Sequence, residues 1–138
     1  MAVSAATADV ALLLGRVLFG SVLAFMGLNH FMQADEMAGY ADAKGLPSPR
    51  LAVLGSGLLL AASGVGIVVG AFPLLAALGL IVFFVVATPT MHDFWRFEGE
   101  RKQQEMTDFM KNVALLGGSI AFVALSSDTW AYSLGLGL

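Results

Sequence analysis

The polar side chains that could do chemistry in this chain gather at the ends of its apolar stretches. Each of the two histidines has a polar neighbour, and a lysine–asparagine pair opens a later apolar stretch. An imidazole can donate a hydrogen bond to a quinone carbonyl and exchange a proton near neutral pH. Such a cluster could also hold an anionic lipid head group. The candidate ligand-binding residues are Asn29, His30, His92, Asp93, Lys111 and Asn112, and, inside the first apolar stretch, Arg16.

Arg16 lies about two turns inside the first apolar stretch. An arginine near the centre of a bilayer costs about 2.5–3.5 kcal/mol on insertion scales, so it needs a partner or a route to water. Steps of about 100° per residue place it on one stripe, which we expect to face other helices. The stripe consists of Arg16, Gly20, Leu23, Gly27 and His30. Asp9 and Asp128 are the expected counter-ions of Arg16, and snorkelling to the surface is the alternative.

Other roles for the two histidines compete with a quinone or lipid site. The simplest is ordinary hydrogen bonding at the membrane interface. Haem or metal ligation is discounted, because no further histidine exists and no carboxylate lies within a spanning segment. We therefore predict no metal and no haem, and keep quinone as the candidate cofactor.

The chain lacks the residues on which many enzymes depend. It has no cysteine, which excludes disulfides, thiolate metal sites, cysteine-ligated iron–sulfur clusters and thiol redox chemistry within the chain. It has no phosphate-binding loop, nucleophile elbow or intramembrane carboxylate pair. We assign no catalytic residue and expect that the protein is not an enzyme on its own.

Composition defines the class of protein that holds these residues. Of the 138 residues, 58% are hydrophobic and 12% are charged. Soluble domains have about 45–50% apolar and about 25% charged residues, so a soluble enzyme and a disordered chain are both excluded. The net charge of -3 disfavours nucleic acid as a partner. We predict an all-α integral membrane protein in contact with membrane lipid.

Four apolar stretches are long enough to cross a bilayer, which requires about 20 residues as a helix. They predict a single-domain four-helix bundle over residues 1–138, with helices at 10–31, 51–70, 73–90 and 109–126. Gly70 and Pro73 delimit a tight turn, and Asp108 is placed to cap the fourth helix. Small residues allow close packing within one bundle or in a homo-oligomer, namely Ala62, Gly66, Gly70, Ala114, Gly117, Gly118 and Ala121.

The basic residues predict the orientation. Six of the seven lysines and arginines lie in the segments 33–50 and 92–111, which the spans bring to the same side. By the positive-inside rule, both segments are expected in the cytoplasm and both termini outside, in a multi-pass protein of the cell membrane. Helical spacing over 37–44 predicts a short surface helix, whereas 92–108 is expected to be a solvated connector.

Four segments, in this order and spacing, resemble a known family. They are Gly15-Arg16-Val17-Leu18-Phe19-Gly20 continuing to Asn29-His30-Phe31, then Gly39 to Pro47, then His92-Asp93-Phe94-Trp95, and then Lys111-Asn112 to Gly118. On these segments the chain is identified as a member of the DoxX family over nearly its whole length. The resemblance implies a small four-helix membrane protein. Many members carry an acidic residue near the position of Leu60, so a mechanism that needs this carboxylate is not expected in this chain.

The resemblance also implies a place in a redox system. Relatives are tied to membrane oxidoreductases, among them a thiosulfate–quinone oxidoreductase and a complex that links superoxide and thiol defence in actinobacteria. We therefore predict an accessory or subunit of a quinone-linked system with a soluble or membrane oxidoreductase partner. It would bind quinone or lipid at the cytoplasmic ends of the first, third and fourth helices. A non-enzymatic scaffold or assembly factor is the alternative, and a small-solute transporter is a third hypothesis.

Overall fold

The computed structural model describes residues 1–137 of the chain, most of which are helical. Its elements are α1 (Ala5–Met32), α2 (Ala34–Ala43), α3 (Pro49–Val69), α4 (Pro73–Met91), the short 3-10 helix η1 (Phe94–Arg96) and α5 (Gly99–Leu125). Four helices are long and apolar enough to cross a membrane, namely α1, α3, α4 and α5. Over the described residues no strand is formed. The predicted all-α architecture with four candidate membrane spans is confirmed.

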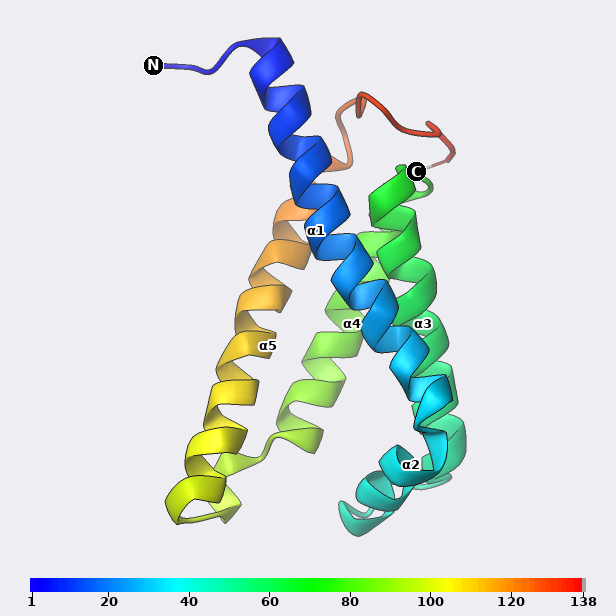
Figure 1. Ribbon diagram of the computed structural model, residues 1–138, viewed down its shortest axis with the longest axis vertical. Helices are drawn as coiled ribbons and strands as arrows, with labels where there is room; N and C mark the ends of the chain where they lie inside the picture. Colours follow the sequence, from blue (N-terminus) through cyan, green and yellow to red (C-terminus); the bar gives the residue numbers. More distant parts are fainter. Residues whose placement is uncertain (138) are drawn as a thin grey trace.

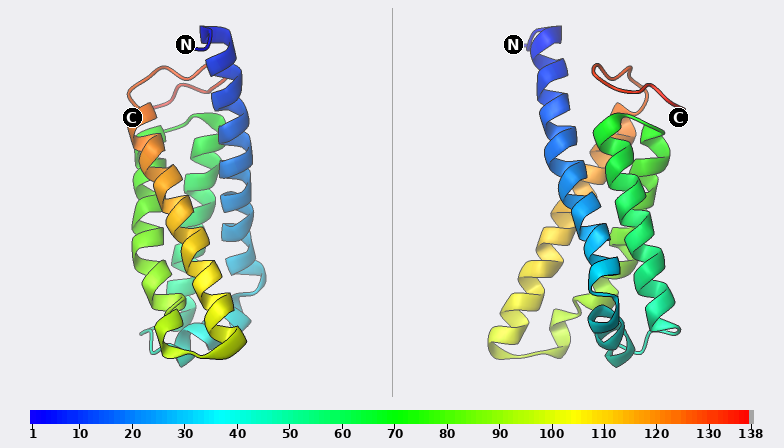
Figure 2. Two further views of the ribbon diagram at one scale, coloured as in Figure 1. Left: turned by 90° about the vertical axis from the view of Figure 1, so that its left-hand side faces the viewer. Right: turned by 45° about the vertical axis from the view of Figure 1, so that its right-hand side comes forward.

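The bundle is elongated and its two ends differ (Figure 1, Figure 2). The N-terminus, the turn between α3 and α4, and the C-terminal segment lie at one end, which we call the terminal end. Helices α2 and η1 lie at the other end, which we call the loop end. The two basic segments therefore share one end of the molecule, as predicted. Helix α5 leans away from α1 toward the loop end (Figure 2).

Helix α5 begins much earlier than the sequence analysis expected. It starts at Gly99 rather than at residue 109, so the prediction of a solvated connector up to residue 108 was wrong. Asp108 is inside the helix and does not cap it. Only apolar residues were counted in that prediction, yet 100–106 is rich in Glu, Lys, Arg, Gln and Met, which are strong helix formers. The predicted surface helix is confirmed, and α2 is that helix.

The seam between α1 and α3 depends on glycine. Arg16, Gly20, Leu23 and Gly27 are the buried residues of α1, which confirms the predicted stripe. A Cβ atom on Gly20 would lie 2.6 Å from the carbonyl oxygen of Gly64, and one on Gly27 would lie 2.6 Å from that of Gly57. Glycines at such crossings let two helix backbones approach closely, as is typical of packing in lipid.

The small residues of α3 and α5 that were predicted to allow close packing make contacts outside the α1–α3 seam. Gly66 packs at the α3–α4 turn, where a Cβ atom on it would lie 3.0 Å from the Cβ of Ala76. Gly70 ends α3 with a φ of 68°, a left-handed conformation that glycine adopts without strain. On α5, Gly118 faces the ring of Phe19 from α1. Gly57 and Gly64 are the glycines of α3 that meet α1. The contacts of Gly66 and Gly118 lie within one bundle, as predicted.

The apolar core occupies the middle and the terminal half of the bundle. Its fully buried side chains include Leu23 of α1, Leu60 and Ile67 of α3, and Leu80 and Phe84 of α4. Phe122 of α5 and Trp130 of the C-terminal segment complete it at the terminal end. The part of the bundle near the loop end is less filled, and a cavity lies there.

Candidate functional site

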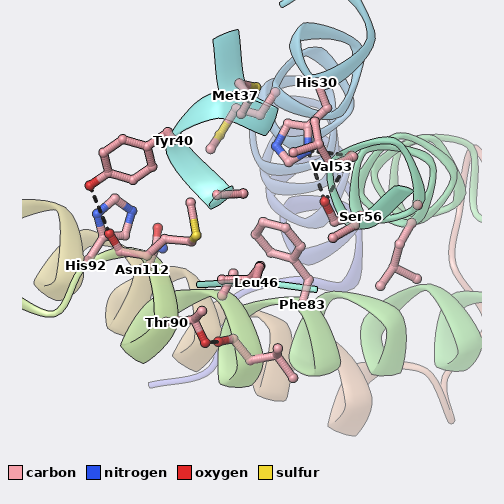
Figure 3. Close-up of a pocket in the computed structure, with 18 of the residues that line it drawn as sticks. His30, Met37, Tyr40, Leu46, Val53, Ser56, Phe83, Thr90, His92 and Asn112 are labelled. Carbon is pink, nitrogen blue, oxygen red and sulfur yellow. Dashed lines mark hydrogen bonds between the residues drawn. The ribbon is translucent and has the colours of Figure 1, made fainter. Parts of the chain in front are cut away.

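A cavity of about 850 Å³ lies at the loop end, bounded by residues of α1, α2, α3, α4 and α5. Its walls are mostly apolar, with Met26, Leu59 and Phe83 among the lining residues. Polar side chains stand on the same walls, namely His30, Tyr40, Ser56, His92 and Asn112 (Figure 3). A cavity of this size with a few polar groups on apolar walls has the character of a small-molecule site.

His30 is fixed on the α3 side of the cavity. Its Nδ1 lies 3.1 Å from the carbonyl oxygen of Val53 and 3.1 Å from Oγ of Ser56 (Figure 3). Its ring centre is 6.1 Å from that of Phe83. Close packing of α1 on Gly57 brings the imidazole to this position. Since Nδ1 makes the internal bonds, Nε2 is the nitrogen left for a ligand.

His92 stands on the α4 side, in a chain of hydrogen bonds that reaches α2. Its Nδ1 lies 2.9 Å from Oε2 of Glu105, and the other carboxylate oxygen of Glu105 accepts a bond of 2.9 Å from the hydroxyl of Tyr40. Partial burial, followed by the hydrogen bond to Glu105, raises the pKa of Tyr40, so its phenol stays a donor at neutral pH. The carboxylate orients the imidazole of His92 much as an outer-shell partner orients a metal-bound histidine.

A nearly buried ion pair fastens α2 to the segment after α4. The ammonium of Lys44 binds the carboxylate of Asp93, and their side chains are only 9% and 7% exposed. Arg96 adds a contact of 3.2 Å between its Nε and Asp93. The ammonium also lies 4.8 Å from the ring centre of Phe97, a favourable cation–π distance. Together with the bond from Tyr40 to Glu105, these contacts hold α2 across the loop end.

The structure brings three of the seven predicted site residues to one cavity. His30, His92 and Asn112 line it. Asp93 is engaged by Lys44, and Asn29 is not among the lining residues. Lys111 pairs with Asp108 at 3.0 Å, its side chain is 66% exposed, and it does not face the cavity. The reason is helical geometry, because Lys111 and Asn112 are adjacent on α5 and therefore point about 100° apart.

Sequence reasoning missed Glu105, Tyr40 and Ser56. Glu105 lies seven residues before Asn112, which is the spacing of one helix face. This spacing is informative only if the segment before residue 109 is helical, and the sequence analysis took that segment as a connector. Tyr40 was placed on the surface helix without a role. Ser56 carried no signal, since a lone serine in an apolar helix usually bonds its own backbone.

Arg16 lies at the terminal end, far along α1 from the cavity. Its guanidinium donates from Nε to the carbonyl of Ile67 at 3.1 Å and from Nη2 to that of Val68 at 2.8 Å. Nη1 and Nη2 also donate to the C-terminal segment, at 2.8 Å and 3.2 Å, to the carbonyls of Ala131 and Tyr132. The guanidinium carbon is 5.1 Å from the ring centre of Trp130. With 0% of its surface exposed, Arg16 does not snorkel.

Backbone carbonyls, rather than the predicted carboxylates, compensate this charge. The last carbonyls of a helix have no partner within it and carry the negative end of its dipole. Arg16 satisfies two of them at the end of α3, and the amide of Leu134 donates to the next one, Val69, at 2.8 Å. In residues 1–137 the ion pairs of Arg16 with Asp9 and Asp128 do not form, so the prediction of these counter-ions was wrong.

One group of side chains near the cavity has donors suited to a metal ion. Ligand atoms of His92, Glu105 and Asp108 lie within 4.8 Å of one another. Each of them already has a protein partner, because His92 and Glu105 bond each other and Asp108 pairs with Lys111. The expectation of no metal stays a prediction.

Comparisons with known proteins agree with the resemblance seen in the sequence. The family described as DoxX matches residues 11–93, which is more than half of the chain. The inner membrane protein YphA of Escherichia coli (strain K12) is 28% identical over 122 residues, covering 88% of this chain and 84% of that protein. No solved structure matches the chain.

Proposed function

Since the chain belongs to the DoxX family of integral membrane proteins, we propose that it is an accessory or subunit of a quinone-linked membrane redox system. In this role it binds quinone in the cavity at the loop end. Its spanning helices and its similarity to an inner membrane protein make it a multi-pass protein of the cell membrane. That the loop end faces the cytoplasm stays a prediction.

The observation that carries the proposal is the pairing of apolar walls with hydrogen-bonding side chains in one cavity. A quinone has an apolar ring and tail and two carbonyl oxygens that accept hydrogen bonds. The amide of Asn112 is a donor of the required kind. His30 and His92 use Nδ1 as the donor to protein oxygens, so Nε2 accepts a hydrogen bond from a quinol hydroxyl, and it donates to a quinone carbonyl only as the imidazolium. All three residues line the cavity. Phe83 and Met26 offer apolar contacts for a ring.

The charges of the cavity favour a quinone over an anionic lipid head group. Among its lining residues there is no lysine or arginine, whereas Glu36 is one of them. Lys44 is neutralised by Asp93, and Lys111 points elsewhere. A phosphate would therefore enter this cavity without a cation to compensate it, at a large desolvation cost.

The redox step itself is assigned to a partner oxidoreductase. The chain has no cysteine to form a redox-active thiol or to ligate an iron–sulfur cluster. What it offers is a bound, oriented quinone next to a hydrogen-bonded chain formed by Tyr40, Glu105 and His92. This arrangement suits an accessory subunit more than an enzyme acting alone.

The test is the quinone content of the purified protein. The protein is extracted with its native lipids, and quinones and phospholipids are quantified for the wild type and for His92→Ala, Asn112→Ala and Lys111→Ala. We expect quinone with the wild type, a loss of quinone in the first two variants, and no change in Lys111→Ala, whose exposed side chain lies next to the site. Absence of quinone from the wild type, or equal content in all variants, would overturn the proposal.

A further inference from the structure

We infer that the ligand of the cavity reaches it sideways from the lipid, through an opening between α3 and α4 bordered by Gly55, Val82 and Val86. The inference rests on the proposed function and deepens it. It defines the ligand as an amphiphile dissolved in the bilayer, with a ring-shaped head inside the cavity and an apolar tail that passes out between the two helices.

The face of the cavity toward the water is only partly covered, and the lining residue Glu36 is exposed there. Helix α2 crosses the loop end and contributes Met37, Tyr40 and Ala41 to the cavity wall. The pair of Lys44 and Asp93 holds it, with side chains that are only 9% and 7% exposed. A hydrogen bond from the hydroxyl of Tyr40 to Glu105 connects α2 to α5 on the far side of the cavity. A ligand with an apolar tail would have to pass these charged and polar groups to enter from water.

The seam between α1 and α3 is closed. At this level of the bundle the backbones touch, since a Cβ atom on Gly57 would lie 3.0 Å from the carbonyl oxygen of Gly27. No ligand can pass between helices packed at this distance. Access from this side is excluded.

The side between α3 and α4 is open. Val82 and Val86 of α4 line the cavity and are nevertheless 56% and 61% exposed. Gly55 of α3 also lines the cavity and is exposed. It lies six residues after the first residue of α3, which is about 9 Å along the helix axis and therefore in the apolar layer. The exposed surface of these residues faces lipid rather than water.

Gly55 differs from the glycines of the α1–α3 seam in a way that fits an opening. A Cβ atom on Gly55 would meet nothing within 4 Å, whereas one on Gly20 or Gly27 would collide with the neighbouring backbone. Helix packing therefore does not require a glycine at position 55. The absence of a side chain at Gly55 leaves the border of the opening unobstructed.

The first experiment asks what the opening faces, without any quinone. Because the chain has no cysteine, Gly55→Cys provides a single thiol. Gly39→Cys on α2 and Gly117→Cys on α5 are matched controls for water and lipid, since Cβ atoms at both positions also meet nothing within 4 Å. In liposomes we expect a charged maleimide to label Gly39→Cys at least about tenfold faster than the other two. Equal labelling of Gly55→Cys and Gly39→Cys by this reagent would overturn the opening to lipid.

The second experiment blocks the opening reversibly. A bulky apolar methanethiosulfonate converts Gly55→Cys to a mixed disulfide, which a reductant removes. Association of a long-tailed quinone analogue in nanodiscs is measured before modification, after it and after reduction. We expect association to slow at least about tenfold and to recover on reduction, with less than about a twofold change in Gly117→Cys.

The outcomes separate this inference from the proposed function. If the wild type binds the quinone and the modified Gly55→Cys binds it equally fast, the sideways route is wrong and the quinone site stands. If the wild type binds no quinone, the proposed function is wrong, and the labelling of Gly55→Cys still decides whether the cavity opens to lipid.

Discussion

The two ends of α1 each carry an ionisable side chain of the same predicted stripe, and their surroundings differ. At the terminal end, Arg16 makes hydrogen bonds to four carbonyls and lies beside Trp130 in a filled core. At the loop end, His30 makes its internal bonds through Nδ1 and borders a cavity of about 850 Å³. An ionisable group whose nitrogen atoms are all engaged by the protein fixes the structure, whereas one with a nitrogen left beside a cavity can bind a ligand.

The strongest test of this comparison is Arg16→Ala. The substitution leaves the carbonyls of Ile67 and Val68 buried without their donor, at about 1–3 kcal/mol for each orphaned group. It also releases the C-terminal segment. We expect a large drop in the thermal unfolding temperature in detergent. The matched control is Arg50→Ala, whose pair with Asp35 is exposed and should contribute about 0–1 kcal/mol. Equal effects of the two substitutions would contradict the structural role of Arg16.

At the loop end, the largest effect on stability is expected from Lys44→Ala. It leaves the nearly buried carboxylate of Asp93 with the exposed Arg96 as its remaining cation, at a cost of about 1–3 kcal/mol. Because the core at the terminal end is not involved, hydrogen exchange should rise in α2 and stay unchanged in the last turn of α3. Lys111→Ala serves as the control. Uniformly faster exchange along the chain would show that the two ends are not independent.

A smaller effect, on binding rather than on stability, is expected from Glu105→Gln. The variant removes the charge that orients His92 and keeps the shape of the side chain. Quinone occupancy should fall about three- to tenfold, which corresponds to about 1 kcal/mol. Glu98→Gln, at the exposed start of α5, should leave occupancy unchanged. A loss of occupancy in both variants would assign the effect to the net charge of α5.

The smallest effect concerns pH. The pKa of Tyr40 is raised by partial burial and by Glu105. A raised pKa means that the contribution of the phenol is fully present below its ordinary value of about 10 and is lost as the pH rises through the shifted value. We expect α2 to loosen, by hydrogen exchange, only at strongly alkaline pH. Tyr40→Phe should abolish this pH dependence. Loosening at neutral pH in the wild type would contradict the assignment.

Much of the fold could be predicted because apolar length and glycine placement are local properties of the chain. The bounds of α3 and α4 agree with the predicted helices within two residues at each end. The buried stripe of α1 follows from helical geometry alone. The start of α5 could not be found in this way, because a polar helix that leaves the membrane has no apolar signal.

The site was predicted less well, for a related reason. Residues were grouped by their depth in the membrane, and depth does not tell in which direction a side chain points. Asn112 faces the cavity and its neighbour Lys111 does not. Lys44 neutralises Asp93, and Glu105 orients His92. Both Lys44 and Glu105 lie in segments that the sequence analysis left outside the site.

The sequence by itself determined a four-span membrane bundle, the sharing of one end by its two basic segments, and the stripe of α1 that is buried. These follow from hydrophobicity and helical period, which act along the chain. Only the tertiary structure decided that Arg16 binds the end of α3 and that His30, His92 and Asn112 line one cavity. Such contacts join residues that are distant in sequence, and their geometry is set by how the helices pack.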